Sequence, residues 1–297
     1  MLAHKIKVPI YTVLALSAFA GNSVLCRLAL GTEDIDPASF TFVRLLSGSF
    51  TLIVLLLIRT RGDLANGISR GNWPAATMLF IYAIFFAAAY SSLDTGTGAV
   101  VLFGAVQITL IIKSLRDGEA LSGFEWLGLA VAFIGFALLL LPGTTAPSSV
   151  GIVLMIVAGM GWGLYTAAGQ ASKDALADTS FNFLRATPLA TLVLIFWPLE
   201  NTWSTNGIFL ACASGALASG IGYGIWYAVL PSLKSVQAAV LQLTVPFLAA
   251  GGGIIFSDEI ITARLLTTGT IVCAGIGLVV LGKAKKSGST RENGADR

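Results

Sequence analysis

The chain has 297 residues, of which 56% are hydrophobic and only 11% are charged, and its formal net charge is +3. A soluble domain carries about 25% charged residues, so this composition excludes a soluble fold and indicates an integral membrane protein. The small positive charge is explained by orientation in a membrane and gives no support to nucleic-acid binding.

Ten apolar segments follow one another along the chain, separated by prolines, glycines and charged residues. The hydrocarbon core of a bilayer needs about 20 apolar residues per helix, so each segment is predicted to be a transmembrane helix. The remaining tail, residues 283–297, is charged and polar and is predicted to be disordered. The predicted spans are residues 8–30, 37–58, 73–92, 96–114, 122–141, 150–172, 180–198, 207–230, 235–256 and 262–282.

The first segment imitates a secretory signal peptide. Lys5 and Lys7 precede an apolar run that reaches a small-residue sequence at positions 18–20. The apolar run continues past this sequence to Leu30. We therefore expect the segment to stay uncleaved, as the first helix of the bundle.

The charges of the predicted loops alternate in sign. Cytoplasmic loops of membrane proteins carry an excess of Lys and Arg, so the sign of each loop predicts its side. This pattern predicts a protein of the cell inner membrane with both termini in the cytoplasm. The basic side carries Arg59, Arg61, Arg70, Lys113, Arg116, Lys173 and Lys234, and the opposite side carries Glu33, Asp34, Asp36, Asp94, Glu200, Asp258 and Glu259.

One unit is written twice in this chain. The sequence from Ser39 to Arg44 returns from Ser180 to Arg185, 141 positions later, with four of six residues identical. Nearly the same offset relates further residues, which are the pairs Gly21 and Gly161, Ala99 and Ala239, Glu119 and Glu259, and Gly135 and Gly275. We predict two repeats, residues 1–143 and 144–282.

Five spans per repeat is an odd number, so the second repeat is predicted to enter the membrane upside down relative to the first. Inverted repeats of this kind are typical of transporters, because they supply two exchangeable conformations. The predicted fold is therefore an all-α membrane protein of ten transmembrane helices, arranged as two inverted five-helix repeats around a central cavity.

The ordered set of features resembles the drug/metabolite transporter superfamily, EamA type. The set comprises the ten spans, an arginine early in the second helix of each repeat, and a glutamate between the fourth and fifth helices of each repeat. Within the superfamily, the chain resembles the bacterial amino-acid exporters, including the aromatic amino-acid exporter group. One departure is Val106, followed by Gln107, where the family often has a proline in the fourth helix. The second repeat carries the resemblance best, in Tyr223 to Tyr227, Ala238 to Gly253 with Pro246, Asp258, Glu259, Gly269 and Gly275.

Several kinds of chemistry find no support in the sequence. No Asp or Glu lies near the middle of a predicted span, and the only histidine, His4, lies outside the membrane. Cys26, Cys212 and Cys273 have no metal-binding or disulfide spacing. We therefore expect no enzyme, no metal and no cofactor. The polar residue in the middle of the first helix is Asn22, where related proton-driven transporters have Glu, so we expect no stoichiometric proton coupling.

Arg44 and Arg185 are interpreted as structural residues. Each lies about two turns into its helix, from where it could reach the interface or bond a neighbouring loop. The alternative is that these arginines anchor an anionic group of the substrate. Because a contact at one central site would not require the residue in both repeats, the structural role is favoured.

Neutral polar and aromatic residues at depth are the candidate substrate-binding residues. Amides at this depth either bond across helices or line a cavity. Aromatic side chains at helical spacing would give the cavity an apolar wall with hydroxyl and indole donors. Tyr90, near a helix end, is interpreted as part of an interfacial belt instead. The candidates are Asn22, Tyr82, Phe86, Gln107, Trp162, Tyr165, Tyr223, Trp226 and Gln242; Gln237 was a further amide at depth.

Pro246 and Gly252 are the candidate gating residues. Pro246 is expected to kink the ninth helix near mid-membrane. The Gly251–Gly253 run weakens the same helix and is interpreted as a bending point.

The sequence thus predicts a monomeric inner-membrane transporter that exports or facilitates small organic metabolites by alternating access. Amino acids, aromatic or neutral, are the expected substrates. Export of drugs or other hydrophobic compounds is the alternative, and a membrane-embedded enzyme is disfavoured. The expected partners are a small-molecule substrate and the lipid bilayer.

Overall fold

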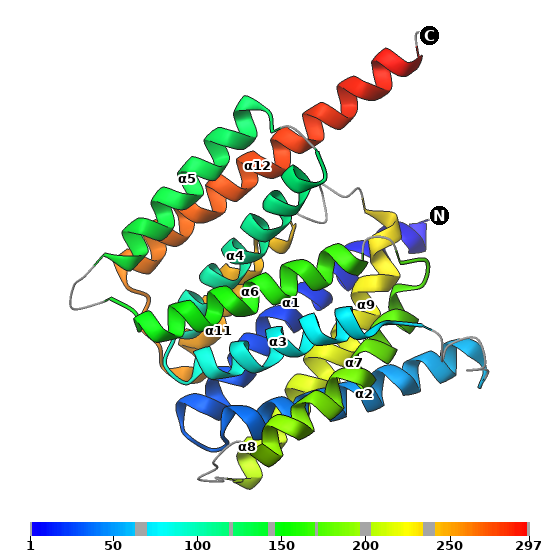
Figure 1. Ribbon diagram of the computed structural model, residues 1–297, viewed down its shortest axis with the longest axis vertical. Helices are drawn as coiled ribbons and strands as arrows, with labels where there is room; N and C mark the ends of the chain where they lie inside the picture. Colours follow the sequence, from blue (N-terminus) through cyan, green and yellow to red (C-terminus); the bar gives the residue numbers. More distant parts are fainter. Residues whose placement is uncertain are drawn as a thin grey trace.

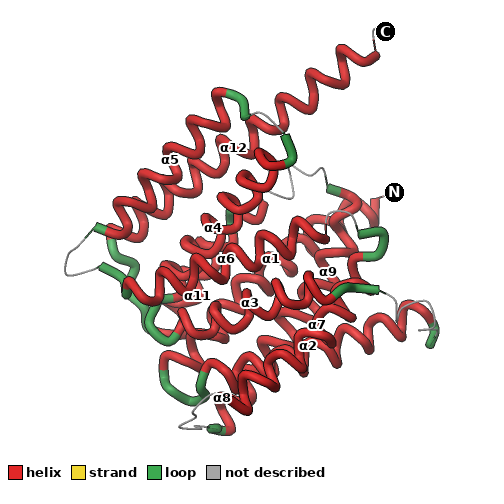
Figure 2. The backbone as a smooth tube through the Cα atoms, in the orientation of Figure 1, coloured by secondary structure: helices red, strands yellow, loops and turns green. Residues whose placement is uncertain are grey.

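The computed structural model describes residues 2–62, 70–118, 121–141, 146–169, 172–196, 203–233 and 241–295. Over these residues the chain is helical and has no strand, apart from an isolated bridge between Ile35 and Trp203. The helices run from lower left to upper right in Figure 1, and Figure 2 shows the loops gathered at the two ends. The all-helical fold class is as predicted.

The helices follow the predicted spans in chain order, with labels as in Figure 1. In the second half, one span is built from α8, a π-helical segment η1 and α9, followed by the short 3₁₀ turn η2 (Leu230–Ser232). The bounds are α1 (Leu2–Gly31), α2 (Pro37–Thr60), α3 (Trp73–Tyr90), α4 (Thr95–Arg116), α5 (Gly123–Leu140), α6 (Ser149–Gly169), α7 (Ala175–Phe196), α8 (Thr205–Ala213), η1 (Ser214–Ile221), α9 (Gly222–Val229), α11 (Val245–Ser257) and α12 (Ala263–Ala295).

Within the described residues, eight helices are long and apolar enough to cross a membrane, and two apolar helices are shorter. The two shorter helices span Gly123–Leu139 and Val245–Ser257. The second is short because a turn at residues 243–244 precedes it. Pro246 therefore lies in the first turn of α11, where its missing N–H would be unpaired anyway. The predicted ninth span is thus broken directly before Pro246, instead of being kinked within one helix, and a gating role for Pro246 stays a prediction.

The helices pair across the two halves of the chain. α2 packs against α7, and α5 against α12; this last pair lies along the upper left edge of Figure 1. α3 packs on α6, and the α8–η1–α9 span packs on α1. At the contact between α5 and α12, a Cβ added to Gly275 would lie 2.4 Å from the backbone nitrogen of Ala132. The absence of a side chain there permits the close approach of the two helices.

The π-helical segment η1 interrupts its span where it meets α2. A Cβ added to Gly215 would lie 2.2 Å from the carbonyl oxygen of Arg44, so the two backbones are in direct contact. Wide π-helical turns within helices are frequent at functional sites. Here the turn brings two buried hydroxyls, Ser214 and Ser219, next to α1 and α2.

The end of α12 differs from expectation. The helix continues to Ala295, although residues 283–297 were predicted to be disordered. Extending an existing helix needs no new nucleus, and Ala284, Lys285 and Lys286 are good helix formers.

Candidate functional site

A cavity of about 690 Å³ lies at the centre of the helix bundle. Its lining comes from both halves of the chain, including α1 to α4, α6, α7, η1 and α9. At one end it is lined by residues of the loops before α3 and α7, such as Gly71 and Ser172. We call this the mouth end, and the opposite end, near Tyr90 and Glu259, the sealed end.

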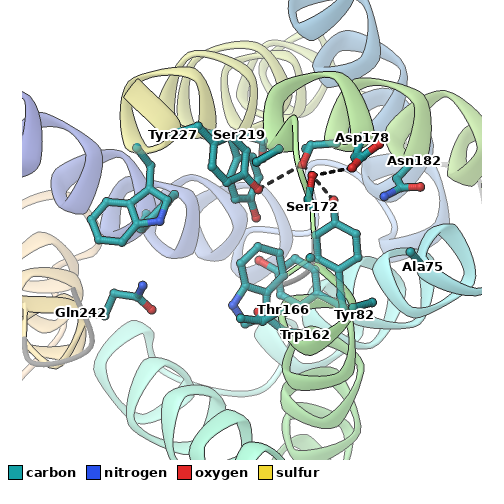
Figure 3. A pocket seen from close by; sticks show the side chains of 18 of the residues that line it. Ala75, Tyr82, Trp162, Thr166, Ser172, Asp178, Asn182, Ser219, Tyr227 and Gln242 are labelled. Atoms are coloured by element: carbon teal, nitrogen blue, oxygen red, sulfur yellow. Dashed lines mark hydrogen bonds between the residues drawn. The ribbon is translucent and has the colours of Figure 1, made fainter. Parts of the chain in front are cut away.

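The structure brings all nine predicted substrate-binding residues to this one cavity. Figure 3 shows Tyr82 and Trp162 on one side of the space and Gln242 on another. Their role in binding stays a prediction, and Gln237 falls outside the described residues. The nine lining residues are Asn22, Tyr82, Phe86, Gln107, Trp162, Tyr165, Tyr223, Trp226 and Gln242.

Aromatic rings form a continuous wall with Trp162 at its centre. The ring centroid of Trp162 lies 4.9 Å from that of Tyr82 and 5.5 Å from those of Tyr165 and Tyr223. Tyr223 in turn stacks on Tyr227 at 6.0 Å. Tilted and offset contacts at these distances are favourable for aromatic pairs. The wall joins α3, α6 and α9 and gives the cavity a largely aromatic side.

A buried polar network lies beside this wall. The hydroxyl oxygen of Tyr82 accepts hydrogen bonds from Arg44 Nη2 at 3.1 Å and from Asn22 Nδ2 at 3.3 Å. Ser214 Oγ donates to Asn22 Oδ1 at 2.6 Å, and Arg44 Nε donates to Ser219 Oγ at 3.4 Å. The network connects α1, α2 and α3 to η1, so the π-helical turn supplies both serine partners.

The surroundings of Arg44 differ from those expected, and its structural role stays a prediction. Its side chain neither reaches an interface nor bonds a loop; it is 1% exposed and is one of the cavity-lining residues. Its guanidinium carbon lies 5.2 Å from the ring centroids of both Tyr82 and Phe86. The sequence could not place this side chain, because the depth of a residue along its helix does not reveal which side the helix turns to the bundle centre.

Arg185, the counterpart of Arg44 in the second repeat, has a different environment. Its Nη1 donates to the carbonyl oxygens of Arg70 at 2.7 Å and Phe181 at 3.2 Å. The bond to Arg70 is the contact to a neighbouring loop that the sequence interpretation expected. Two equivalent arginines therefore occupy unlike sites, one in the cavity and one at the loop before α3.

The mouth end holds a carboxylate that the sequence analysis missed. Asp178 lines the cavity because α7 begins at Ala175, earlier than the predicted span, which began at 180. Asp178 Oδ1 accepts from the backbone nitrogen of Gly71 at 3.0 Å, and Oδ2 accepts from Ser172 Oγ. Figure 3 shows the Ser172–Asp178 contact. This carboxylate fastens two loops at the mouth to α7.

The sealed end is closed by a charged cluster that joins α1 to the loop after α11. Arg27 Nε lies 3.3 Å from Glu259 Oε1, and Arg27 Nη1 donates to the carbonyl oxygen of Tyr90 at 3.2 Å. Both Glu259 oxygens accept from the backbone nitrogen of Thr95 at 2.9 Å. Tyr90 is fully buried, so its interpretation as an interfacial belt residue is wrong.

The candidate gating residues lie away from the cavity lining. A Cβ added to Gly252 would lie 2.5 Å from Val24 Cγ2, so this glycine makes a close contact with α1. A Cβ added to the neighbouring Gly251 would have no other atom within 4 Å. A bending role for Gly252 stays a prediction, and substitution at Gly251 is the cleaner probe of it.

Among the residues that the structure describes, no group of three or more His, Cys, Asp or Glu side chains could hold a metal ion. The polar groups at cavity depth are guanidinium, amide, hydroxyl and indole groups. Chemically, such groups can form hydrogen bonds, and the guanidinium of Arg44 also carries a charge.

The sequence model of the EamA-like transporter family matches residues 7–141 and again residues 149–281. The chain belongs to this family. The resemblance to the drug/metabolite transporter superfamily is therefore confirmed, and the match in both halves covers nearly the whole chain.

Other proteins resemble this EamA-like transporter over most of their length. An uncharacterised protein of Pseudomonas aeruginosa is 46% identical over 281 residues, covering 94% of this chain and 97% of the relative. The threonine/homoserine exporter RhtA of Escherichia coli is 28% identical, covering 71% of this chain and 68% of the exporter. A probable amino-acid metabolite efflux pump of Escherichia coli is 23% identical, covering 70% of this chain and 76% of the pump.

A solved crystal structure shares the fold of this EamA-like transporter. It superimposes with a TM-score of 0.61 at 16% identity, covering 91% of this chain and 98% of the other. At this identity the likeness shows the fold alone.

Proposed function

We propose that this EamA-like transporter carries amino acids or closely related small metabolites out of the cytoplasm, as an exporter or facilitator. The observation that carries the proposal is the central cavity of about 690 Å³, lined by aromatic, amide and hydroxyl groups from both halves of the chain. A cavity of this size suits a small organic solute. The names of two relatives, a threonine/homoserine exporter and a probable amino-acid metabolite efflux pump, support the substrate class.

The proposed mechanism is alternating access by two inverted repeats. The family model matches twice, and an odd number of helices in each match would turn the second unit over. The packing supports this symmetry. The third span of each repeat packs on the first span of the other: α3 lies on α6, and the α8–η1–α9 span lies on α1. The second spans of the two repeats, α2 and α7, pack on each other. An exchange of conformations between the halves would open the sealed end and close the mouth.

The loop charges support an inward-open state. The mouth end carries Arg59, Arg70 and Lys173, and basic loops face the cytoplasm in membrane proteins. We therefore propose that the mouth and both termini face the cytoplasm of an inner-membrane protein. In this state the substrate enters from the cytoplasm, as export requires. The cavity is enclosed by helices of one chain, which supports a monomer as the transporting unit.

Proton coupling is not part of the proposal. The carboxylate on the cavity lining, Asp178, lies at the mouth and accepts two hydrogen bonds. Deeper in the cavity, Asn22 stands where a proton-coupled transporter would need a side chain that binds and releases a proton. Exchange or facilitated diffusion is the proposed mode. A proton flux that depends on substrate, measured in reconstituted vesicles, would contradict it.

Efflux of drugs or other hydrophobic compounds is the second candidate function. The aromatic wall around Trp162 favours this second function, because aromatic side chains bury large apolar areas against a hydrophobic ligand. The buried polar network of Arg44, Asn22 and Tyr82 favours the amino-acid proposal, because an apolar compound would leave those groups unused. A membrane-embedded enzyme has the least support, since the family is one of transporters.

Counterflow in proteoliposomes tests the proposed function. The purified protein is reconstituted, the vesicles are loaded with mixed amino acids, and uptake of labelled phenylalanine or threonine is followed without gradients of pH or potential. Accumulation of label above that in protein-free vesicles is expected. If folded protein takes up no labelled amino acid, the substrate class is wrong and hydrophobic compounds become the leading candidates.

A further inference from the structure

Arg44 has a buried guanidinium with no carboxylate partner among the described residues. It is 1% exposed, and the salt bridges of the described part of the chain involve Arg27, Arg59 and Lys113 instead. Its Nη1 nitrogen has no hydrogen-bond partner there. A buried charge is costly unless it is paired, so this arrangement is unusual for a purely structural residue.

Arg27 shows what a paired arginine looks like in the same bundle. It contacts two carboxylates, those of Glu259 at 3.3 Å and Asp94 at 3.7 Å, and the carbonyl oxygen of Tyr90. Within the described part of the chain, the partners of Arg44 are instead neutral: the hydroxyls of Tyr82 and Ser219 and the faces of two rings. Aromatic faces offset part of the desolvation of a guanidinium without neutralising it.

The free donors of Arg44 lie together at one end of its guanidinium group. A guanidinium has five N–H donors. Nε donates to Ser219 and one N–H of Nη2 donates to Tyr82, while Nη1 has no partner. Among the described residues, both N–H groups of Nη1 and the second one of Nη2 therefore have no partner, and Nη1 is buried in the wall of the cavity. Two neighbouring guanidinium nitrogens are the geometry that binds both oxygens of a carboxylate.

We propose that Arg44 is the carboxylate-binding residue of the cavity, and that the substrates are monocarboxylates with an apolar or aromatic body, a class that includes zwitterionic amino acids. The inference rests on the proposed transport function and narrows its substrate class. The adjoining rings of Tyr82, Phe86 and Trp162 would take the apolar body of such a ligand. Arg44 is the arginine at cavity depth, whereas the second lining arginine, Arg70, lies in the loop at the mouth end. One deep arginine matches a single negative charge, which argues against phosphate esters.

The test compares ligands that differ only in the carboxylate. L-Phenylalanine and 3-phenylpropionate are titrated into the purified full-length protein by calorimetry, and so are L-phenylalaninamide and 3-phenylpropionamide. Each acid is expected to bind about 10- to 100-fold more tightly than its amide, the range expected for hydrogen bonds to charged groups. Equal affinity for acid and amide, or no binding of either acid to folded protein, would overturn the proposal.

Variants of Arg44 locate the effect. Arg44→Gln should bring the acid-to-amide ratio close to one, and Arg44→Lys should keep part of it, because Lys retains the charge without the paired donors. Arg185→Gln is the matched control, since Arg185 bonds the carbonyl of Arg70 and does not line the cavity. Its ratio should match that of the wild type. A ratio unchanged in Arg44→Gln overturns the proposal, and if that variant does not fold, the wild-type comparison still decides.

Transport and binding separate the two proposals. If acids bind in an Arg44-dependent way but no amino acid is carried in counterflow, the proposed function fails and the carboxylate site stands. If amino acids are carried and their amides compete equally well in the wild type, the carboxylate site fails and the proposed function stands.

Discussion

Glu259 and Arg27 are 232 residues apart in sequence, yet Arg27 Nε lies 3.3 Å from Glu259 Oε1 at the sealed end of the cavity. Glu259 also accepts from Thr95 Oγ1 at 2.9 Å. The carboxylate thus holds together α1, the start of α4 and the loop after α11. Ion pairs that must break for a cavity to open are a common element of two-state switches.

We predict that Glu259→Gln loosens the sealed end. The amide keeps the shape of the side chain but loses the charge, so its contacts with Arg27 and Thr95 weaken. Ser23 lines the cavity one turn from Arg27 and is replaced by Cys, in a background where the three native cysteines are Ala. Labelling of this thiol from the outside by an impermeant maleimide should rise several-fold in Glu259→Gln.

Asp258→Asn is the control for this experiment, because the described contacts of Arg27 do not include Asp258. Its labelling rate should match that of the parent. An equal rise in both variants, or none in Glu259→Gln, would contradict the gating role of Glu259.

We predict that Tyr82→Phe destabilises the protein by about 1–3 kcal/mol. The hydroxyl of Tyr82 accepts from both Arg44 and Asn22, and its loss leaves buried donors unpaired. Thermal unfolding in detergent measures the change, with Tyr11→Phe as control because Tyr11 is 41% exposed. Equal unfolding temperatures for the two variants would show that the network contributes little.

We predict that Gly251→Ala slows transport without lowering stability. Nothing lies within 4 Å of an added Cβ at Gly251, and Ala stiffens a helix relative to Gly by up to about 1 kcal/mol. Counterflow rate and unfolding temperature are measured on the same preparation. Unchanged turnover would argue against bending at the Gly251–Gly253 run. Gly21→Ala, which also adds a Cβ in open space, is the control in α1.

We predict a pH-dependent stability difference between wild type and Asp174→Asn. Burial raises the pKa of Asp174, but hydrogen bonds from Arg59 and from the backbone of Ala177 outweigh it, so the pKa lies below its usual value of 3.8. A lowered folded-state pKa stabilises the fold above the unfolded pKa, and this stabilisation is lost as the pH falls through the folded pKa.

The magnitude is small because the pair is partly exposed. The side chains of Arg59 and Asp174 are 45% and 26% exposed, and after screening by solvent such pairs contribute about 0.2–1 kcal/mol. Unfolding temperatures of the two proteins should differ slightly at pH 7 and converge as the pH falls below 3.8 and through the lowered folded-state pKa. A difference that stays constant from pH 7 to pH 3 would rule out this carboxylate as its source.

The aromatic and amide residues of the cavity could be predicted, while the arginines could not. Trp162 and Tyr165 lie near the middle of a long apolar segment, and large polar-tipped side chains at that depth turn toward other protein groups. For Arg44 and Arg185 the local sequence is nearly identical, so nothing in either segment distinguishes them. Their surroundings do, because Arg44 meets η1 and Tyr82 while Arg185 meets the loop at Arg70.

Sequence by itself determined the membrane class, the succession of apolar helices and the duplicated unit, because hydropathy and repetition are properties of the chain read in order. The tertiary structure alone decided which polar groups meet. It paired Arg27 with Glu259, placed Asp178 at the mouth, and put Arg44 in the cavity lining with no carboxylate partner among the residues that the structure describes. These outcomes depend on how helices distant in sequence turn toward one another, and packing of the whole bundle sets that rotation.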